Sequence, residues 1–336
     1  MVTEINIEEV FSLQLPIIDV RSPGEFEKGH IPNAINISLF TNDERAHVGT
    51  VYVQQSQEAA MKLGYEYVTP KLQNFINDAL NVAPKAEVIV HCWRGGMRSH
   101  AFAQHLSDNG FSDVKLIIGG YKTYRNYVLD TLATPSKIKV LGGYTGSGKT
   151  YILEELKKLG HQVIDLEGLA NHKGSTFGGI GQLEQPTVEQ FENNLYEEFR
   201  QLDLTKPIWV EDESYDIGRV KIPKPFFDQM QNSQFYFIEL SQHERAKHLA
   251  AEYGICDNKM LAEAIYRISK RLGGLSVKNA ISALEHDDYY DVAMIALHYY
   301  DKLYLKGMNN PKWKNVISIP LPYINHSANA LIIQNL

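Results

Sequence analysis

The stretch "KIKVLGGYTGSGKTYILEELKKLG" constrains the fold more than any other part of the chain. An apolar run typical of a buried strand comes first, GYTGSGKT at residues 143–150 follows, and a helical pattern comes last. The central eight residues match G-x-x-x-x-G-K-[ST], in which backbone N–H groups and the lysine hold a diphosphate. Because the strand, loop and helix occur in the required order, we expect a parallel α/β domain with a diphosphate site.

The diphosphate-binding residues expected from this loop are Gly143, Thr145, Gly146, Ser147, Gly148, Lys149 and Thr150. Thr150 is also a candidate ligand of Mg²⁺, the one metal that the motif suggests. A later apolar run, "PIWVEDES", ends in acids, as do strands that carry a magnesium-supporting carboxylate. We predict this role for Asp212, with Glu211 and Glu213 as alternates, and a water-facing charged strand end as the alternative. No base-specific nucleotide motif or arginine finger is identified, so the sequence predicts a diphosphate site and not ATP hydrolysis.

A second loop, in "EVIVHCWRGGMRSHAFAQHL", carries one of only two cysteines. A short apolar run ends just before Cys92, and a helical pattern follows the loop. Backbone N–H groups at the start of a helix and the charges of Arg94 and Arg98 both favour a thiolate. We therefore predict that Cys92 is an exposed nucleophile, with Arg94 and Arg98 as catalytic partners. The surrounding anion cradle is expected to comprise Trp93, Gly95, Gly96 and Met97. A buried structural cysteine is the alternative.

Strands alternate with helices along most of the chain, which favours parallel sheets. The stretch "ATPSK" reads as a linker, so we expect one domain over residues 1–132 and another over residues 137–336. From residue 242 to about residue 304 the pattern is helical. The end of the chain reads as a strand followed by a short helix.

Composition excludes several classes of protein. Two cysteines cannot form a disulfide framework, the N-terminus has no signal-like apolar core, and no apolar run is long enough to span a bilayer. We expect a cytoplasmic protein in which Cys256 is structural. The formal net charge of −7 means that any nucleic acid must bind a local basic surface.

The stretches "IIDVRSPGEFEKGHIPNAINI" and "VHCWRGGMRS" resemble the rhodanese family over roughly residues 5–130. The resemblance implies a loop cysteine that carries sulfur as a persulfide. It also implies a mainly structural role for Asp19, Arg21 and Glu25, with Arg21 in an ion pair. Five residues separate Cys92 from Arg98, whereas sulfur-transferring rhodaneses have four, and H-C-x5-R-[ST] is also the signature of cysteine phosphatases. The wider loop leaves open phosphoester hydrolysis or attack on a phosphate that carries a transferable atom.

Together with "DLEGLANHKGSTFGGIG" and "WVEDES", the two loops resemble the tRNA 2-selenouridine synthase family over nearly the whole chain. The resemblance implies an N-terminal rhodanese-like parallel-sheet domain and a C-terminal P-loop NTPase-like α/β domain with a helical C-terminal region. It implies a transferase that acts in two steps on the wobble 2-thiouridine of tRNA. Geranyl diphosphate first S-geranylates the base, and selenium from selenophosphate then displaces the geranyl-sulfur group.

Under this interpretation the P-loop holds the diphosphate of the prenyl donor, and Cys92 holds selenium as an S-selanylcysteine. His172, Lys173 and Ser175 would form a polar loop beside the diphosphate, although an ordinary glycine-rich surface loop is the alternative. No tightly bound cofactor is expected. We expect a monomer that binds tRNA and no membrane, with salt-dependent phosphate contacts. The candidate tRNA contacts are Arg245, Lys247, Arg267, Lys270, Arg271 and Lys278.

Three other functions fit part of the sequence. A rhodanese-type sulfurtransferase regulated by a nucleotide at the P-loop would turn over thiosulfate and bind ATP. A cysteine phosphatase would hydrolyse generic phosphomonoesters. A non-enzymatic tRNA-binding scaffold would not need the intact cysteine and lysine.

Overall fold

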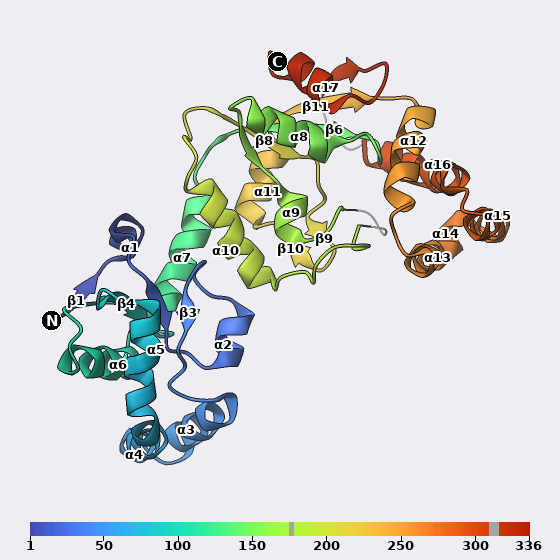
Figure 1. Cartoon of the computed structure of the whole chain (residues 1–336). Helices are drawn as coiled ribbons and strands as arrows, with labels where there is room; N and C mark the ends of the chain where they lie inside the picture. The colour runs from blue at the N-terminus through green and yellow to red at the C-terminus, as the bar shows by residue number, and fades with distance from the viewer. Residues whose placement is uncertain (175–177, 309–315) are drawn as a thin grey trace. The chain divides into compact units, whose positions relative to one another are not determined.

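The computed structural model describes residues 1–174, 178–308 and 316–336, and the chain divides into two compact units. The units are Met1–Thr131 and Leu132–Leu336. Each contains a five-stranded sheet in which every strand pair is parallel (Figure 1). The α/β fold class predicted from the sequence is therefore confirmed.

The first unit has the strand order β1-β5-β4-β2-β3. Its strands are β1 (Val2–Ile5), β2 (Ile17–Asp19), β3 (Ile35–Asn36), β4 (Glu87–His91) and β5 (Asp113–Ile117). Its helices are α1 (Ile7–Leu13), α2 (Pro23–Lys28), α3 (Asn42–Gln54), α4 (Gln57–Val68), the 3₁₀ turn η1 (Thr69–Lys71), α5 (Leu72–Val82), α6 (Met97–Asp108) and α7 (Gly120–Leu132), which ends at the unit boundary.

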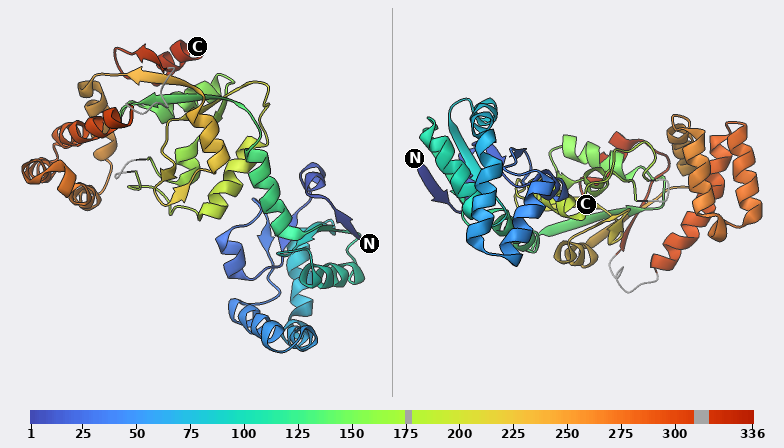
Figure 2. Two further views of the ribbon diagram at one scale, coloured as in Figure 1. Left: turned by 180° about the vertical axis from the view of Figure 1, so that it is seen from behind. Right: turned by 90° about the horizontal axis from the view of Figure 1, so that it is seen from below.

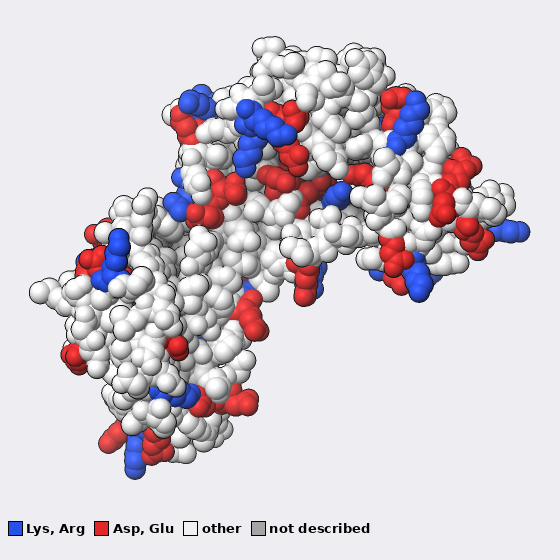
Figure 3. Space-filling model, viewed as in Figure 1, with Lys and Arg blue, Asp and Glu red and all other residues white. Residues whose placement is uncertain are grey.

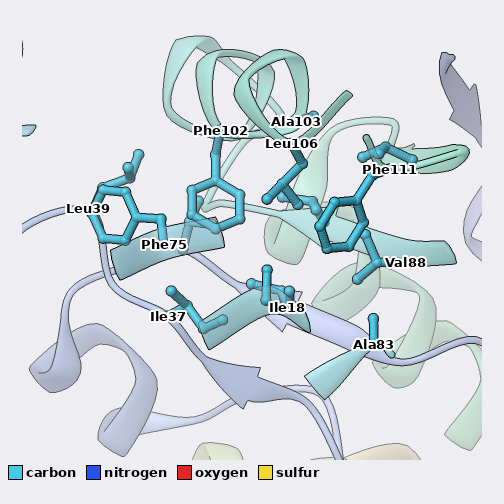
Figure 4. Packing of buried hydrophobic residues seen from close by; sticks show 14 of the residues in the cluster. Ile18, Ile37, Leu39, Phe75, Ala83, Val88, Phe102, Ala103, Leu106 and Phe111 are labelled. Atoms are coloured by element: carbon cyan, nitrogen blue, oxygen red, sulfur yellow. The ribbon is translucent and has the colours of Figure 1, made fainter. Parts of the chain in front are cut away.

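Strand β4 is central in this sheet, and Val88, Ile89 and Val90 are fully buried. Consecutive buried residues are typical of a parallel strand that is covered on both faces. Phe102 of α6 and Phe75 of α5 pack together over the strands (Figure 4), with ring centroids 5.5 Å apart. The carboxyl end of β4 is thus held rigidly where the cysteine loop begins.

The second unit has the strand order β12-β11-β6-β8-β7 and a separate antiparallel pair, β9 and β10. Its strands are β6 (Lys137–Gly143), β7 (Gln162–Ile164), β8 (Pro207–Glu211), β9 (Asp216–Ile217), β10 (Val220–Lys221), β11 (Gln234–Glu239) and β12 (Val316–Pro320). Its helices are α8 (Lys149–Lys158), α9 (Leu166–Ala170), α10 (Val188–Phe199), α11 (Lys224–Gln231), α12 (Gln242–Tyr253), α13 (Asn258–Arg267), α14 (Ser269–Leu272), α15 (Gly274–Glu285), α16 (Tyr289–Met308) and α17 (His326–Ile333).

Strand β6 is central in the second sheet, and its carboxyl end leads into the glycine-rich loop. Gly142 is needed there because a Cβ would lie 2.1 Å from the ring of Phe235 on the neighbouring strand β11. Helices α12–α16 share an apolar core and form a group of their own beside the sheet (Figures 1 and 2). In parallel α/β sheets, ligands bind at the carboxyl ends of the strands, where both motif loops lie.

The predicted terminal strand and helix are confirmed as β12 and α17. The apolar stretch after Gly29 forms a strand of only two residues, β3, because a turn at residues 32 and 33 uses most of it. The sequence did not predict β1 or the β9–β10 hairpin. None of the helices in the described ranges combines the length and the apolar character needed to cross a bilayer.

Candidate active sites on two loops

The cysteine loop curls between β4 and α6. Gly96 is the N-cap residue of α6, and Gly95 has a φ of +61°. A Cβ on Gly95 would lie 2.8 Å from the carbonyl oxygen of Ile117, so glycine is required by both conformation and space. Tyr121 donates its backbone N–H to the Cys92 carbonyl at 2.9 Å, which ties the loop to the start of α7. The loop therefore has a fixed shape.

The backbone of this loop contains hydrogen-bond donors without acceptors among the described residues. Within the described chain, the backbone N–H groups of residues 93–98 have no hydrogen-bond acceptor. Consecutive free N–H groups at the start of a helix form an anion-binding nest. The predicted cradle residues Trp93, Gly95, Gly96 and Met97 all lie within this run of N–H groups without acceptors.

The predicted exposure of Cys92 is wrong. Cys92 is only 3% exposed and belongs to the apolar core of the first unit, together with Val90 and Phe102. The Sγ atom lies 3.2 Å from the Ser99 hydroxyl oxygen and 4.0 Å from the Gly96 carbonyl oxygen. Ser99 is itself fully buried. Ser99 is therefore a neighbour of the sulfur that the sequence analysis missed, although it follows Arg98 in the motif.

Arg98 is the fixed cation of the loop. It donates to Glu25 with an Nη1–Oε2 distance of 2.7 Å, and Arg45 lies 3.5 Å from the same carboxylate. Burial works to lower the pKa of Arg98, but the hydrogen bonds and the charge of Glu25 outweigh it and raise that pKa. One carboxylate shared by two guanidinium groups leaves a net positive charge beside the loop. Arg94 is exposed.

A buried ion pair lies next to the Cys92 loop. Arg21 and Asp19 are both fully buried, with an Nη2–Oδ2 distance of 2.6 Å, so the predicted structural ion pair is confirmed. The Arg21 guanidinium lies 3.8 Å from the ring centroid of Tyr121, whose backbone anchors Cys92. Burial works to raise the pKa of Asp19, but the charges of His91 and Arg21 lower it overall. This network therefore supports the loop through the contact between Arg21 and Tyr121.

An apolar groove of about 660 Å³ borders Arg98. Helix α3 supplies most of its wall, including Val48, Tyr52 and Val53, and Phe40 adds to it. Val53 is 82% exposed, so the groove is open to solvent. Its volume lies in the range of about 300–1,000 Å³ that is typical of small-ligand sites.

The glycine-rich loop at residues 143–150, called the P-loop below, also lies between a strand, β6, and a helix, α8. Gly148 is the N-cap residue of α8, and Lys149 donates to the Gly143 carbonyl at 3.2 Å, across the loop. In the described part of the chain, the backbone N–H groups of residues 145, 146 and 148–150 have no acceptor. These groups and the lysine are the donor set that a diphosphate needs.

Several carboxylate side chains lie close to the P-loop. Thr150 donates its hydroxyl to Glu167 at 2.9 Å, and the Glu167 backbone N–H donates to Glu211 at 2.6 Å. Burial, and then the charges of Asp165 and Glu167, raise the pKa of Glu211 well above its ordinary value. Its Oε2 atom is buried with no partner in the structure as described. Burial, and then the charge of Glu167, likewise raise the pKa of Glu213.

The predicted metal ligand Asp212 accepts a hydrogen bond of 2.7 Å from the Tyr304 hydroxyl. Burial raises the pKa of Asp212 to about 6, against the opposing effects of Tyr304 and Lys149. No group of three or more metal-ligating His, Cys, Asp or Glu side chains is preformed among the described residues. The unpartnered oxygen of Glu211 and the excess of carboxylates nevertheless fit a cation, and Thr150 lies next to them.

Arg245 requires a correction. It was predicted to contact tRNA, but it is only 2% exposed and forms an ion pair of 2.8 Å with Asp301. It also donates to the Thr145 carbonyl at 3.1 Å, and its guanidinium lies 4.9 Å from the ring centroid of Tyr144. Arg245 therefore anchors the P-loop to α12 and cannot reach a tRNA phosphate.

His172 and Lys173 lie close to the acids that face the P-loop. The His172 backbone N–H donates to the Glu167 carbonyl at 3.1 Å, and the Lys173 ammonium contacts Glu252 at 3.3 Å. Burial lowers the pKa of His172. Ser175, the third predicted residue of this loop, lies outside the described residues.

Comparison with known proteins identifies the family. A family model described as the tRNA 2-selenouridine synthase AAA domain matches residues 136–318, and a rhodanese-like domain model matches residues 6–127. The chain is 33% identical over 378 residues to a tRNA 2-selenouridine synthase of Nitrosomonas eutropha, which covers 95% of this chain and 96% of the relative. The corresponding protein of Bdellovibrio bacteriovorus is 35% identical, covering 90% and 91%. That of Nitrosomonas europaea is 39% identical, covering 74% and 66%. The chain belongs to the tRNA 2-selenouridine synthase family.

The remaining basic side chains predicted to contact tRNA in this family member lie in α12–α15. Lys247 pairs with Glu244 at 2.7 Å, and Arg267 pairs with Glu263 at 3.6 Å, so each charge is partly offset. Lys270 and Lys278 are exposed. Arg271 lines a pocket of about 310 Å³ together with Leu272, Ser276, Met294, Ile295, His298, Tyr299 and Lys302. Acidic and basic groups are interspersed on the face in Figure 3.

Proposed function

We propose that the chain converts wobble 2-thiouridine of tRNA to 2-selenouridine by S-geranylation followed by selenation. The observation that carries the proposal is the presence, in one member of this family, of two loops whose backbone N–H groups have no acceptor among the described residues. One loop contains Cys92, which would act as a nucleophile, and the other contains Lys149 and no cysteine, so the two loops differ in chemistry. Two anionic donors, selenophosphate and geranyl diphosphate, match these two chemistries.

Geranylation is assigned to the P-loop. Lys149 and the free N–H groups of the loop would hold the diphosphate and stabilise its charge as the allylic C–O bond breaks. Thr150 and Asp212 would hold Mg²⁺, with Glu211 and Glu213 nearby, and the ion would neutralise charge on the leaving diphosphate. Arg245 keeps the loop in its binding shape through the Thr145 carbonyl.

Selenation is assigned to the Cys92 loop. Its thiolate would attack selenophosphate, whose tetrahedral anion matches the nest and Arg98. The apolar groove next to Arg98 is suited to the C10 geranyl chain of the modified base, because its wall is formed by Phe40, Val48, Tyr52 and Val53. The charge shared by Arg45 and Arg98 at the rim of the groove complements an RNA phosphate.

Mass spectrometry of nucleosides tests this function directly. A 2-thiouridine tRNA incubated with the protein, geranyl diphosphate and selenophosphate should yield 2-selenouridine. Omitting selenophosphate should leave S-geranyl-2-thiouridine, and omitting geranyl diphosphate should leave the substrate unchanged. Selenation without any prenyl donor would refute the two-step assignment.

The phosphatase alternative rests on one specific observation, the five-residue spacing in the Cys92 loop. It predicts turnover of p-nitrophenyl phosphate at a rate comparable to RNA modification. A sulfurtransferase would instead turn over thiosulfate, and the spacing argues against that reaction.

A further inference from the structure

We propose that the pocket among helices α14, α15 and α16 holds one unpaired nucleotide of the tRNA anticodon loop. This inference rests on the proposed function, because it takes tRNA as the substrate. The pocket has a volume of about 310 Å³, near the lower end of the range that is typical of small-ligand sites. A single nucleotide suits a concave site of this size, whereas an RNA double helix is recognised across an extended surface.

The exposed side chains of the pocket are basic. Arg271 of α14 and Lys302 of α16 line it, together with the imidazole of His298. Neither Arg271 nor Lys302 forms an ion pair with an acid in the described part of the chain. Lys247 and Arg267, outside the pocket, do form such pairs. In a protein of net charge −7, a concave basic patch of this kind is suited to a phosphate group.

The acids of these three helices do not offset the basic residues of the pocket. They are Glu285 of α15 and the two aspartates of α16, Asp291 and Asp301. Asp301 is already paired with the buried Arg245 at 2.8 Å, and neither of the other two lines the pocket. The walls of the pocket therefore keep their positive charge for a ligand.

The rest of the pocket wall is apolar. Leu272, Met294 and Ile295 are half-buried and pack against the core of the helical group. Tyr299 is 8% exposed, and the Arg271 Nη1 atom lies 3.5 Å from its hydroxyl oxygen. Unpaired bases bind by lying flat on apolar and guanidinium surfaces while their phosphates contact cations. Inorganic phosphate alone would leave the apolar wall unused, so a nucleotide matches the pocket better.

The pocket lies close to the P-loop within the second unit. The residues of α16 that line it have the spacing of one helix face and are Met294, Ile295, His298, Tyr299 and Lys302. Tyr304, two residues further on, points to the opposite side of α16 and donates to Asp212 beside the P-loop at 2.7 Å. A helix with its side chains is about 10–12 Å across, so roughly one helix diameter separates the pocket from this acid. A wobble base at the P-loop and a neighbouring nucleotide in the pocket can therefore belong to one anticodon loop.

Binding of a fluorescein-labelled anticodon stem-loop RNA to the full chain tests the pocket. Arg271→Ala/Lys302→Ala should weaken binding by at least about tenfold and make the dependence of log K on log salt shallower by about 1.4, which is about 0.7 for each lost phosphate contact. Lys137→Ala/Lys259→Ala is the matched control, because it removes the same charge from two exposed residues outside the pocket. The control should change the affinity by less than about twofold, since exposed charges away from the RNA are screened.

Two results of these measurements would overturn the inference. Equal weakening by the two double variants would show that only the net charge of the protein matters. A loss of affinity by Arg271→Ala/Lys302→Ala for an acceptor minihelix ending in unpaired CCA, with none for the anticodon stem-loop, would assign the pocket to the other end of the tRNA.

Abasic nucleotides test whether a base enters the pocket. Removal of one loop base other than the wobble base should weaken binding to the wild type by at least about fivefold, because its stacking is lost. Met294→Ala removes part of the apolar wall, so the same abasic RNA should then bind only about twofold more weakly than the intact RNA. An abasic effect of the same size in both proteins would place the base elsewhere and contradict the inference.

RNA modification separates this inference from the proposed function. With geranyl diphosphate and selenophosphate, Arg271→Ala/Lys302→Ala should raise KM for the stem-loop RNA by at least about tenfold and keep kcat within about threefold of the wild type. If the wild type made no 2-selenouridine, the proposed function would fail, and the inference with it. If the wild type made 2-selenouridine and the variant had the same KM, only the inference would fail.

Discussion

The Cys92 loop and the P-loop both follow the central strand of a parallel sheet and both precede a helix, but opposite charges surround them. Arg98 and Arg45 flank the Cys92 loop and share one carboxylate, Glu25, while the buried acid Asp19 is paired. The P-loop is faced by Glu211, whose second oxygen has no partner among the described residues, and by other acids with raised pKa values.

The difference indicates what each loop needs. The Cys92 loop needs no added cation, since the charges of Arg98 and Arg45 exceed that of Glu25 and can offset an incoming anion. The P-loop holds an anion beside carboxylates, which is favourable only if a cation or protons offset them. We therefore expect a metal-independent reaction at the first loop and a metal-dependent one at the second. Four substitutions test this contrast.

Cys92→Ser should have the largest effect. A serine hydroxyl is a far weaker nucleophile than a thiolate, so selenation should fall by at least about 1,000-fold while geranylation continues. The measurement is nucleoside mass spectrometry with each donor supplied in turn. Cys256→Ser is the matched control and should behave as the wild type. Selenation at a normal rate by Cys92→Ser would remove the chemical distinction between the loops.

Asp19→Asn should strongly destabilise the first unit only. Removing one partner leaves Arg21 as a buried uncompensated charge, which costs about 3–5 kcal/mol. Hydrogen exchange should become faster in peptides from β4 and β5 and stay unchanged in those from β6 and β11. Because the pKa of Asp19 is lowered on folding, its contribution is present above the ordinary value of 3.8 and is lost as pH falls below it. Unchanged exchange in β4 would mean that the loop does not depend on this ion pair.

Lys149→Ala should reduce geranylation by at least about 100-fold, because the diphosphate loses its side-chain cation. Selenation of RNA that already carries S-geranyl-2-thiouridine should be unaffected. Lys158→Ala, at the other end of the same helix, is the control. Rates of both steps can be followed on the same RNA. If Lys149→Ala geranylated normally, the P-loop would have to bind some other phosphate.

Glu211→Gln should have the smallest effect and the opposite sign to Asp19→Asn. The raised pKa of Glu211 means that its buried carboxyl group costs folding free energy at pH 7.5, so glutamine should stabilise the metal-free protein by about 1 kcal/mol, which is roughly 2–4 °C in Tm for a unit of this size. Glu239→Gln, at an exposed strand end, should change Tm little. The folded state holds protons on Glu211 and Asp212 more tightly than the unfolded chain, so stability without metal falls as pH rises above about 4.

The same pKa shifts predict tighter Mg²⁺ binding at pH 7.5 than at pH 5.5, where Asp212 is largely protonated. Isothermal titration of the metal at these two pH values measures this difference. A destabilised Glu211→Gln protein, or Mg²⁺ affinity independent of pH, would contradict the account of the acidic cluster.

Local sequence patterns predicted both loops, because each depends on contiguous residues. Three consecutive apolar residues, Val88–Val90, form the core of the strand before Cys92, and the glycine positions follow from backbone geometry. The partners of the loops were harder to predict. Glu167 approaches Thr150 from a different helix, and Tyr304 reaches Asp212 across 92 positions of sequence. Neither spacing has a local signature.

Arg245 and Cys92 show the limits of reasoning from composition. A basic residue in a polar helical segment suggests a surface contact, but Asp301 and the Thr145 carbonyl bury Arg245. A cysteine in a polar, glycine-rich loop suggests exposure, but Cys92 belongs to the apolar core of the first unit. In both cases tertiary contacts determine burial, and these contacts are formed by residues far away in the sequence.

Ordered addition of two variants tests most directly whether the loops act in turn on one nucleobase. Thiolated tRNA would be treated with Cys92→Ser protein and geranyl diphosphate, purified, and then given Lys149→Ala protein and selenophosphate. Nucleoside mass spectrometry should detect 2-selenouridine in this order and none when the two proteins, each with its donor, are added in the reverse order. Selenouridine in the reverse order, or in neither order while wild-type protein succeeds, would contradict the account.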